Sequence, residues 1–361
     1  MTKTIFFVTG LDSGGLENYL LRFLKYKHTE FSDIIVYCKG GKGGILEEEY
    51  KKIPNVKIIK NTIGTVHPKD YINLYKWLKG YSDYSICDFT GNFAGPVLWS
   101  AKKAGIKKRI VFYRSSSNRF KESFFKMKIN KFYNSLVLKY STHILANSSY
   151  GLQFFFGEKL KDNRMKVIYN GIDATIFDGN LKNLRNEFNI PDDGFIVGHT
   201  GRFNEAKNHQ TIINVAKKIV NKNTTIYFIL CGKGVKENLL KTLTSEERKN
   251  ILLFENRNDI PDFLNTMNLY FFPSITEGQP NSLIEAMILG KPFLASNIPS
   301  IKETVYKKYY HCLFDPLDEN AFIKQIENAS LSKIQSDSQL KKLTIEKFNH
   351  QLLFDEFYKE L

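Results

Sequence analysis

The sequence predicts an α/β fold built from two doubly wound, Rossmann-like domains. Short apolar runs rich in Ile, Val and Phe alternate with amphipathic segments of helix length, which is the pattern of parallel sheets with helical crossovers. The pattern starts again near residue 195, and 361 residues are too many for one average domain but suit two. We therefore expect two successive domains, each with a central parallel sheet.

The elements of the first domain follow from the position of its β-branched and aromatic runs, which favour strands. These runs predict strands at 4–9, 33–37, 56–59, 84–87, 108–113, 142–146 and 166–168. Helical periodicity predicts the intervening helices at 15–25, 68–79, 95–103 and 120–139.

The second domain repeats this organisation. Strands are predicted at 195–201, 225–231, 251–254, 269–272 and 292–295, each followed by a helix-capable stretch. Turn formers gather in 169–193 around one short predicted helix at 182–189, so we place the domain boundary near residue 169. The domains are then 1–168 and 169–337, and the amphipathic tail 338–361 is a predicted helix that could pack on either one.

Composition excludes several classes of protein. No stretch approaches the roughly 20 apolar residues of a membrane span, and the N-terminus has an apolar run too short for a secretory signal. We therefore expect a cytoplasmic location. The single, widely spaced cysteines Cys38, Cys87, Cys231 and Cys312 indicate neither a zinc site nor a disulfide framework.

The net charge of +15 is concentrated in one part of the chain. Between Ala101 and Tyr140 there are twelve Lys or Arg residues and one acid, Glu122. Within the basic segment 102–139, residues 119–133 mix cations with apolar residues that at helical spacing make one stripe with a cationic flank, namely Phe124, Phe125, Ile129, Phe132 and Tyr133. Such a pattern is typical of a helix that lies on an anionic membrane. An ordinary crossover helix with its lysines in water would show the same spacing, so both interpretations stay open.

Three segments that follow predicted strands carry candidate site residues, because open α/β sheets bind ligands beyond the carboxyl ends of their strands. After the first strand, Gly14 and Gly15 open a helix whose N-terminus suits an anion. After the strand at 195–201, Arg202 and Lys207 place two cations at a strand end and at the head of the next helix. A diphosphate between them would suit that arrangement. A plain turn or a solvated loop explains either segment equally well.

The third segment runs from Phe272 to Met287 and is the most informative. A strand ends at Pro273, a tight loop holds Glu277, and a helix begins near Asn281 or Ser282, either of which can cap it. The backbone N–H groups between Gln279 and Leu283, with Pro280 in the same loop, would point into the crevice and suit an anion. The carboxylates of Glu277 and Glu285 suit sugar or ribose hydroxyls and positive charge at an anomeric carbon.

The run from Glu277 to Glu285 resembles the E-x7-E motif of retaining glycosyltransferases of family 4, which have the GT-B fold. An isolated pair at this spacing is weak, but further family-like pieces occur in the expected order: Gly-Gly-Leu-Glu at 14–17, Asn-Ser at 147–148, Val-Ile-Tyr-Asn-Gly-Ile-Asp at 167–173, Gly-Arg-Phe through Lys-Asn-His at 201–209, and Gly-Lys-Pro-Phe-Leu-Ala-Ser at 290–296. The resemblance covers nearly the whole chain.

The resemblance implies two Rossmann-like domains facing a cleft, with the nucleotide sugar held mainly by the second and the C-terminal helix returning to the first. It implies that Arg202 and Lys207 clamp the donor diphosphate, that Glu285 binds ribose and that Glu277 lies beside the transferred sugar. Glu277, Arg202 and Lys207 are then the catalytic candidates. The remaining donor contacts implied are Gly15, the loop around Arg257 that flanks the base, and Gln279, Pro280, Asn281 and Ser282.

In this family retention is thought to proceed on one face of the sugar, with the leaving phosphate oxygen helping to deprotonate the acceptor hydroxyl. The resemblance therefore implies no metal site and no cofactor beyond a UDP- or GDP-linked sugar. One departure concerns the acceptor: where many relatives carry histidines, this chain has Asp88 and Arg114. We expect these two residues either to contact the acceptor or the donor in place of histidine, or to pair with each other as part of the structure.

We therefore expect a retaining hexosyltransferase that builds capsule, O-antigen or another surface polysaccharide on a lipid-linked glycan acceptor. Such an acceptor would place the protein at the inner face of the plasma membrane, as a peripheral protein bound through 102–139. The alternative enzymes are a sugar-nucleotide epimerase or a phosphorylase of the same fold. A basic nucleic-acid-binding protein is a remote alternative, since no recognisable nucleic-acid module accompanies the charge and no specific nucleic acid is expected.

Overall fold

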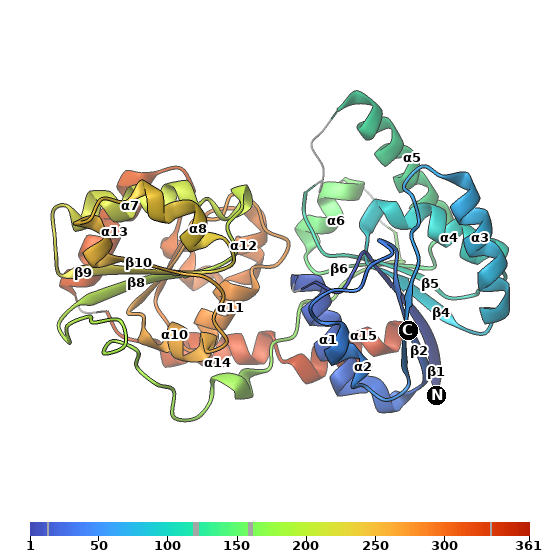
Figure 1. Ribbon diagram of the computed structural model, residues 1–361, viewed down its shortest axis with the longest axis horizontal. Helices are drawn as coiled ribbons and strands as arrows, with labels where there is room; N and C mark the ends of the chain where they lie inside the picture. Colours follow the sequence, from blue (N-terminus) through green and yellow to red (C-terminus); the bar gives the residue numbers. More distant parts are fainter. Residues whose placement is uncertain (13, 118–122, 158–161, 333) are drawn as a thin grey trace. The chain divides into compact units, whose positions relative to one another are not determined.

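The computed structural model describes residues 1–12, 14–117, 123–157, 162–332 and 334–361 (Figure 1). The chain forms two compact units, Met1–Gly171 with Gln351–Leu361, and Ile172–His350. The predicted tail 338–361 is therefore divided between the units. Its first half, helix α14 (Ser338–Lys347), belongs to the second unit, where Asp337 N donates to Gly290 O over 2.8 Å. Only α15 (His350–Glu360) packs on the first unit.

The first unit contains a seven-stranded sheet with the order β3-β2-β1-β4-β5-β6-β7, in which the neighbouring strands are parallel. The switch in strand order lies between β1 and β4, because the chain builds outwards from β1 to β3 and then returns. The strands are β1 (Thr2–Val8), β2 (Phe31–Cys38), β3 (Val56–Lys60), β4 (Ser85–Asp88), β5 (Arg109–Tyr113), β6 (His143–Ala146) and β7 (Met165–Val167).

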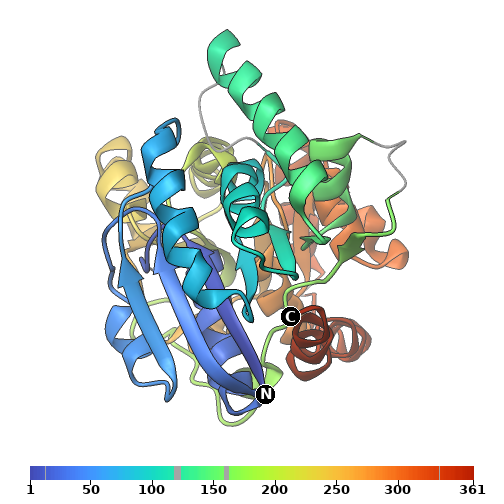
Figure 2. The ribbon, with the colours of Figure 1, turned by 90° about the vertical axis from the view of Figure 1, so that its right-hand side faces the viewer.

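Helices cover both faces of this sheet (Figures 1 and 2). On one face the core joins α1 to α15 through aromatic contacts such as Phe23 with Phe357, whose ring centroids lie 4.7 Å apart. On the other face it joins α3, α4 and α5. The helices of this unit are α1 (Gly15–Lys27), α2 (Glu47–Lys51), α3 (Pro68–Leu78), α4 (Gly95–Lys103), α5 (Phe124–Tyr140), α6 (Ser149–Phe156) and α15, with a 3-10 helix η3 (Gly91–Ala94).

The second unit has a six-stranded parallel sheet with the order β10-β9-β8-β11-β12-β13, and its switch in strand order lies between β8 and β11. Its strands are β8 (Phe195–Thr200), β9 (Ile226–Cys231), β10 (Ile251–Phe254), β11 (Leu269–Phe272), β12 (Phe293–Ser296) and β13 (Leu313–Phe314). The two-residue strand β13 was not predicted, since so short a run carries no periodicity.

The helices of the second unit also lie on both faces of the sheet, with α7, α8 and α13 on one side and α10, α11 and α14 on the other (Figure 1). The helices of this unit are α7 (His209–Val220), α8 (Val235–Leu239), α9 (Glu247–Asn250), α10 (Ile260–Thr266), α11 (Asn281–Ile288), α12 (Pro299–Thr304), α13 (Glu319–Leu331) and α14. The 3-10 helices η4 (Ala174–Phe177) and η5 (Glu205–Lys207) complete the parts used below.

The helix predicted at 182–189 does not form. Residues 185–189 are turns, and Asn189 has a left-handed φ of 55°. Phe188 N donates to Leu184 O over 3.0 Å, so one helical turn forms, but it ends at the left-handed Asn189. The Arg185 guanidinium donates to the carbonyls of Pro191 and Gly194 over 2.9 and 2.8 Å and fixes the turn. The helix predicted at 120–139 is found as α5; the part of that prediction within 118–122 lies outside the described residues.

Candidate functional site

The switch between β8 and β11 brings two of the predicted segments together. These strands are neighbours, with Leu269 opposite Val197 and Tyr270 opposite Gly198, so their carboxyl ends leave the same edge of the sheet side by side. The loop from Gly201 to Asn208 follows β8, and the loop from Pro273 to Pro280 follows β11. Ile275 N donates to Ala206 O over 2.8 Å and ties one loop to the other.

Lys207 is positioned by the two asparagines that flank η5. The side chain of Asn204 caps this short helix by accepting from Lys207 N over 3.0 Å. Asn208 has a left-handed φ of 54°, which asparagine tolerates better than most residues. Its buried amide donates to the carbonyls of Pro273 and Pro316 over 3.0 and 2.9 Å. The backbone around Lys207 is therefore held on both sides.

The Lys207 ammonium and the Glu277 carboxylate form an ion pair at this edge, with 2.7 Å between Nζ and Oε1. The side chains are only 16% and 11% exposed. Nζ also lies 4.6 Å from the centre of the Phe272 ring, so an aromatic face adds to its stabilisation. The structure thus brings together two residues that are 70 positions apart and that the sequence placed in the same pocket.

Arg202 differs from Lys207 in having an exposed side chain. Its loop is anchored by backbone hydrogen bonds, Gly201 N to Cys231 O and Phe203 N to Lys233 O, each 2.9 Å long. Within the part of the chain that the structure describes, no carboxylate lies within ion-pair distance of Arg202. One cation at this edge is therefore neutralised by a protein carboxylate, and another is presented to solvent.

Tyr270 connects the end of β8 with the start of α11. Its buried hydroxyl lies 2.9 Å from Thr200 Oγ1 and 3.2 Å from Thr200 O. Burial raises the pKa of Tyr270, an effect that the neighbouring Glu285 carboxylate reinforces and the Ser282 hydroxyl opposes by hydrogen bonding. The neutral Tyr270 hydroxyl is thus hydrogen-bonded to Ser282 at the switch point, with the Glu285 carboxylate nearby.

Helix α11 begins at Asn281, as predicted, but neither Asn281 nor Ser282 caps it. Pro280 is the N-cap, and no side chain caps the helix. Asn281 N instead donates to Gln279 O over 3.0 Å, in a turn that keeps Gln279 and Pro280 buried. Because no side chain caps α11, the backbone N–H groups of its first turn can donate to an anion at the positive end of the helix dipole.

Two buried histidines lie beneath the loop that carries Arg202. His199 is fully buried in β8 and His209 begins α7, with ring centroids 5.2 Å apart. Burial lowers the pKa of His209 to about 4, helped by the charge of Lys207. Burial likewise lowers the pKa of His199 well below its ordinary value. Both rings are therefore neutral near pH 7, and Nδ1 of His199 lies 2.9 Å from Phe271 O.

Arg257, predicted to flank the base, is already engaged within the second unit. Its guanidinium pairs with Asp259, with Nη2 2.5 Å from Oδ2, and with Glu187, with Nη1 2.9 Å from Oε1. Three phenylalanine rings surround it within 6 Å, which are those of Phe188, Phe254 and Phe263. The structure thus gives Arg257 a role in fixing the loop after β10, and its predicted contact with a base is not tested.

In the first unit, Asp88 ends β4 and is fully buried. Its carboxylate pairs with Lys39 over 2.7 Å and accepts from the backbone and hydroxyl of Thr90 over 2.8 and 2.6 Å. Lys39 also donates to Thr90 Oγ1, and burial lowers the pKa of the lysine. The predicted alternative of an Asp88–Arg114 pair is not among the ion pairs of the described residues, where Asp88 pairs with Lys39. Asp88 therefore stabilises the turn after β4.

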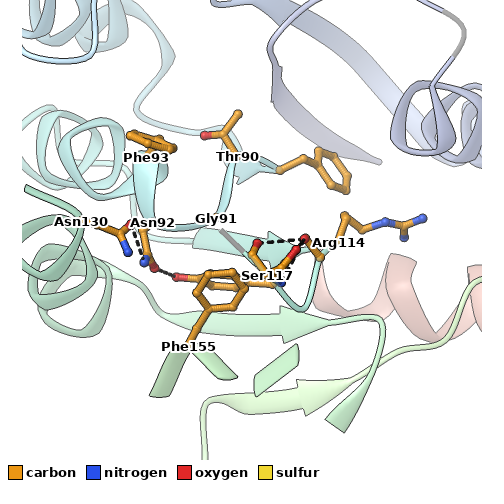
Figure 3. Close-up of a pocket in the computed structure, with 11 residues that line it drawn as sticks. Thr90, Gly91, Asn92, Phe93, Arg114, Ser117, Asn130 and Phe155 are labelled. Atoms are coloured by element: carbon orange, nitrogen blue, oxygen red, sulfur yellow. Dashed lines mark hydrogen bonds between the residues drawn. The ribbon is translucent and has the colours of Figure 1, made fainter. Parts of the chain in front are cut away.

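Arg114 follows β5, and its guanidinium carbon lies 3.7 Å above the centre of the Tyr19 ring. It also lines a small pocket of about 40 Å³ at the ends of β4 and β5 (Figure 3). In this pocket the Tyr113 hydroxyl donates to Asn92 over 2.6 Å, and Asn92 donates to Asn130 of α5 over 3.0 Å. The lining therefore combines aromatic rings with amide and hydroxyl groups.

Gly15, predicted to approach a diphosphate, is the first residue of α1, and Gly14 is its N-cap without a side-chain cap. A Cβ on Gly15 would meet nothing within 4 Å, whereas one on Gly14 would lie 2.2 Å from Glu17 Oε2. The Glu17 carboxylate is the end of a flexible side chain that can move away, so this contact does not require glycine at position 14, whereas Gly15 leaves backbone open at a helix N-terminus.

The sequence analysis did not identify Tyr270, Asn208 or Lys39. Tyr270 was hidden because it lies inside a predicted strand and resembles a core residue. Asn208 is the neighbour of the candidate Lys207, and Lys39 directly follows β2, so inspection of the residues beside each candidate and after each strand would have found them.

Two family models together match nearly the whole chain. Residues 13–175 match the model described as Glycosyltransferase Family 4, and residues 181–346 match the model described as Glycosyl transferases group 1. The O-antigen biosynthesis glycosyltransferase WclY of Escherichia coli is 33% identical over 147 residues, which span 40% of this chain and 40% of WclY. The capsular polysaccharide biosynthesis glycosyltransferase CapH of Staphylococcus aureus is 27% identical over 84% of this chain and 83% of CapH.

Solved structures share the fold over the full length. Anabaena Alr3699/HepE in complex with UDP has a TM-score of 0.81 at 18% identity and covers 99% of both chains. The sucrose-phosphate synthase tll1590 from Thermosynechococcus elongatus has a TM-score of 0.77 at 15% identity, over 99% of this chain and 98% of the other. The predicted α/β fold with two Rossmann-like domains is confirmed.

Proposed function

Because the chain belongs to the group 1 glycosyltransferases, we propose that it moves a sugar from a nucleotide diphosphate sugar to a hydroxyl of a glycan acceptor, with retention of anomeric configuration. Relatives named for capsular polysaccharide and O-antigen biosynthesis support a role in building a surface polysaccharide. A UDP-linked sugar is favoured as donor, because HepE, which shares the fold, is described in complex with UDP and with UDP-glucose.

The observation that carries this proposal is the Lys207–Glu277 pair at the β8–β11 switch, beside the exposed Arg202. A leaving nucleoside diphosphate gains negative charge in the transition state, and two cations with the uncapped N-terminus of α11 would stabilise it. The Glu277 carboxylate, 2.7 Å from Nζ, would then lie beside the anomeric carbon, where positive charge develops.

In the proposed step, the bond between the anomeric carbon and the phosphate oxygen breaks while the acceptor oxygen bonds to the same face of that carbon. The acceptor hydroxyl gives its proton to the departing phosphate oxygen, so no protein base is required. We assign Glu285, together with Ser282, which hydrogen-bonds to Tyr270, to the ribose hydroxyls. With Arg202 and Lys207 supplying the positive charge, no metal ion is required.

We further propose that the acceptor is a lipid-linked glycan, which places the enzyme at the inner face of the plasma membrane. The relatives named for surface polysaccharides support this, because a growing polymer must be retained until it is exported. Arg114 is retained as an acceptor contact because it lines the pocket at the ends of β4 and β5.

The test is a transfer assay followed by proton NMR of the product, with each candidate nucleotide sugar and a glycan acceptor. We expect nucleotide release to depend on the acceptor, the product to keep the donor's anomeric configuration, and EDTA to leave the rate unchanged. An inverted product would contradict retention, and a rate abolished by EDTA would contradict the absence of a metal. Conversion of the nucleotide sugar without an acceptor would identify an epimerase instead.

A further inference from the structure

The N-terminal half of α5 extends beyond the other helices of the first unit (Figures 1 and 2). Residues 123–128 are all exposed, whereas the C-terminal half of the helix, which packs on α4 and η3, buries Tyr133 and Val137. A helix normally turns its apolar side chains inward. In this half of α5, large apolar side chains face water.

Three of these side chains are phenylalanines with unusually large exposed fractions. Phe124, Phe125 and Phe132 are 69%, 77% and 58% exposed. Phe125, the half-buried Ile129 and Phe132 are spaced i, i+4 and i+7, so they form one stripe along the helix. The neighbouring helix α6, which accepts a hydrogen bond from Asn134 at Phe155 O over 3.0 Å, exposes Phe154 to 42%.

The charge around this stripe has a single sign. Lys126, Lys128, Lys131 and Lys139 are exposed, and α5 contains no acidic residue. In the whole range 89–157 the sequence has twelve Lys or Arg residues and one acid, Glu122, which lies outside the described residues. None of these four lysines forms an ion pair with a carboxylate of the described chain. Lys128 Nζ instead lies 4.4 Å from the centre of the Phe124 ring.

We propose that residues Phe124–Phe132 of α5 form a docking surface for an anionic phospholipid bilayer. Phe124, Phe125 and Phe132 enter the boundary between headgroups and acyl chains, and the lysines contact the anionic headgroups. An acidic protein would be attracted by the lysines alone and would give no reason for exposed phenylalanines separated by cations. A bilayer accommodates both, because it offers apolar and anionic groups within a few ångströms of each other.

The docking surface also has a direct connection with the pocket of the first unit. Asn130 of α5 lines this pocket and accepts from Asn92 over 3.0 Å, on the helix that carries the phenylalanine stripe (Figure 3). A helix anchored at a membrane would therefore hold this pocket close to the headgroups. The expectation that this position helps sugar transfer to a lipid-linked acceptor rests on the proposed function. The binding of α5 to a bilayer does not.

The test is co-sedimentation of the full chain with vesicles of phosphatidylcholine, with and without about one third phosphatidylglycerol. We expect binding to the anionic vesicles, falling at least tenfold in partition coefficient between low and high salt. Phe125→Ser combined with Phe132→Ser should reduce binding at least tenfold at low salt. Lys126→Gln, Lys128→Gln and Lys131→Gln together should reduce binding similarly and remove most of the salt dependence.

Matched controls change the same chemistry elsewhere. The triple variant Lys222→Gln, Lys241→Gln and Lys324→Gln removes three exposed lysines from the second unit, and Leu331→Ser with Ile176→Ser removes two exposed apolar side chains. All of these positions are exposed, so unchanged melting curves are expected to show intact folding. Binding that ignores anionic lipid and salt, or that falls equally in the controls, would overturn the proposal.

The two proposals can fail separately. In the α5 variants, transfer to a short soluble glycan should be unchanged, while transfer to the same glycan on a lipid in vesicles should fall at least fivefold. A chain that binds vesicles through α5 but transfers no sugar would refute the proposed function alone. A chain that transfers sugar but does not bind anionic vesicles would refute the docking surface alone.

Discussion

At the scale of single residues, the Lys207–Glu277 pair gives the candidate site its character. A buried ion pair is often worth little to stability, because desolvation of the two charges offsets their attraction. The backbone around this pair is nevertheless fixed by Asn204 and Asn208, one of them in a left-handed conformation. Such precise placement of a pair of doubtful value to stability favours a role in chemistry.

The first prediction concerns Glu277. Glu277→Gln keeps the size of the side chain but removes the negative charge proposed to lie beside the anomeric carbon, so turnover should fall by about 100-fold or more. Nucleotide affinity should stay within about threefold, because the loss of Glu277 leaves the Lys207 charge available to a phosphate. Steady-state kinetics and nucleotide titration measure the two effects.

A matched control is Glu319→Gln. Glu319 pairs with Lys218 of α7 over the same 2.7 Å, but on the side of that helix that contacts α13. This variant should leave turnover within about twofold. If Glu277→Gln behaved in the same way, Glu277 would have no catalytic role.

At the scale of elements, most strands and helices could be predicted, because each is a separate periodic segment. Arg202, Lys207 and Glu277 follow the carboxyl ends of β8 and β11, as the predicted strands indicated. Contacts between elements could not be predicted in the same way. The turns at 185–189 depend on Arg185 reaching two carbonyls, and the Lys39–Asp88 pair depends on the ends of β2 and β4 lying on either side of β1.

The buried His209, where α7 meets the end of β8, predicts that acid destabilises the fold. The pKa of His209 is lowered to about 4 from 6.5, so between these pH values the unfolded chain binds more protons than the folded one. The free energy of unfolding should therefore fall as the pH drops through this window. Between pH 7 and 4.5, His209 alone should lower the free energy of unfolding by about 2 kcal/mol, and His199 acts in the same direction.

Urea unfolding of the wild type and of His209→Gln at pH 7 and 4.5 measures this contribution. The variant should lose less stability on acidification than the wild type does, by about 2 kcal/mol. His311→Gln, at an exposed histidine, should leave the pH dependence unchanged. Equal pH dependence in all three proteins would show that His209 is not held neutral by the fold.

At the scale of the whole molecule, the two units carry different parts of the proposed function. The second unit presents cations and carboxylates at its β8–β11 switch, and the first unit carries a pocket at β4 and β5 and a basic, aromatic helix. The chain crosses twice between the units, at residues 171–172 and 350–351. The match to CapH covers 84% of this chain, so the similarity extends over both units.

The central claim is that a nucleoside diphosphate binds at the β8–β11 switch through Arg202 and Lys207. Its most direct test is thermal unfolding of the chain with UDP, GDP, ADP and CMP, repeated for Arg202→Ala, for Lys207→Ala and for the control Lys222→Ala. We predict that one diphosphate raises the melting temperature of the wild type and the control by several degrees, and that either site variant abolishes the rise. No response to any nucleotide, or an equal response in all four proteins, would contradict the claim.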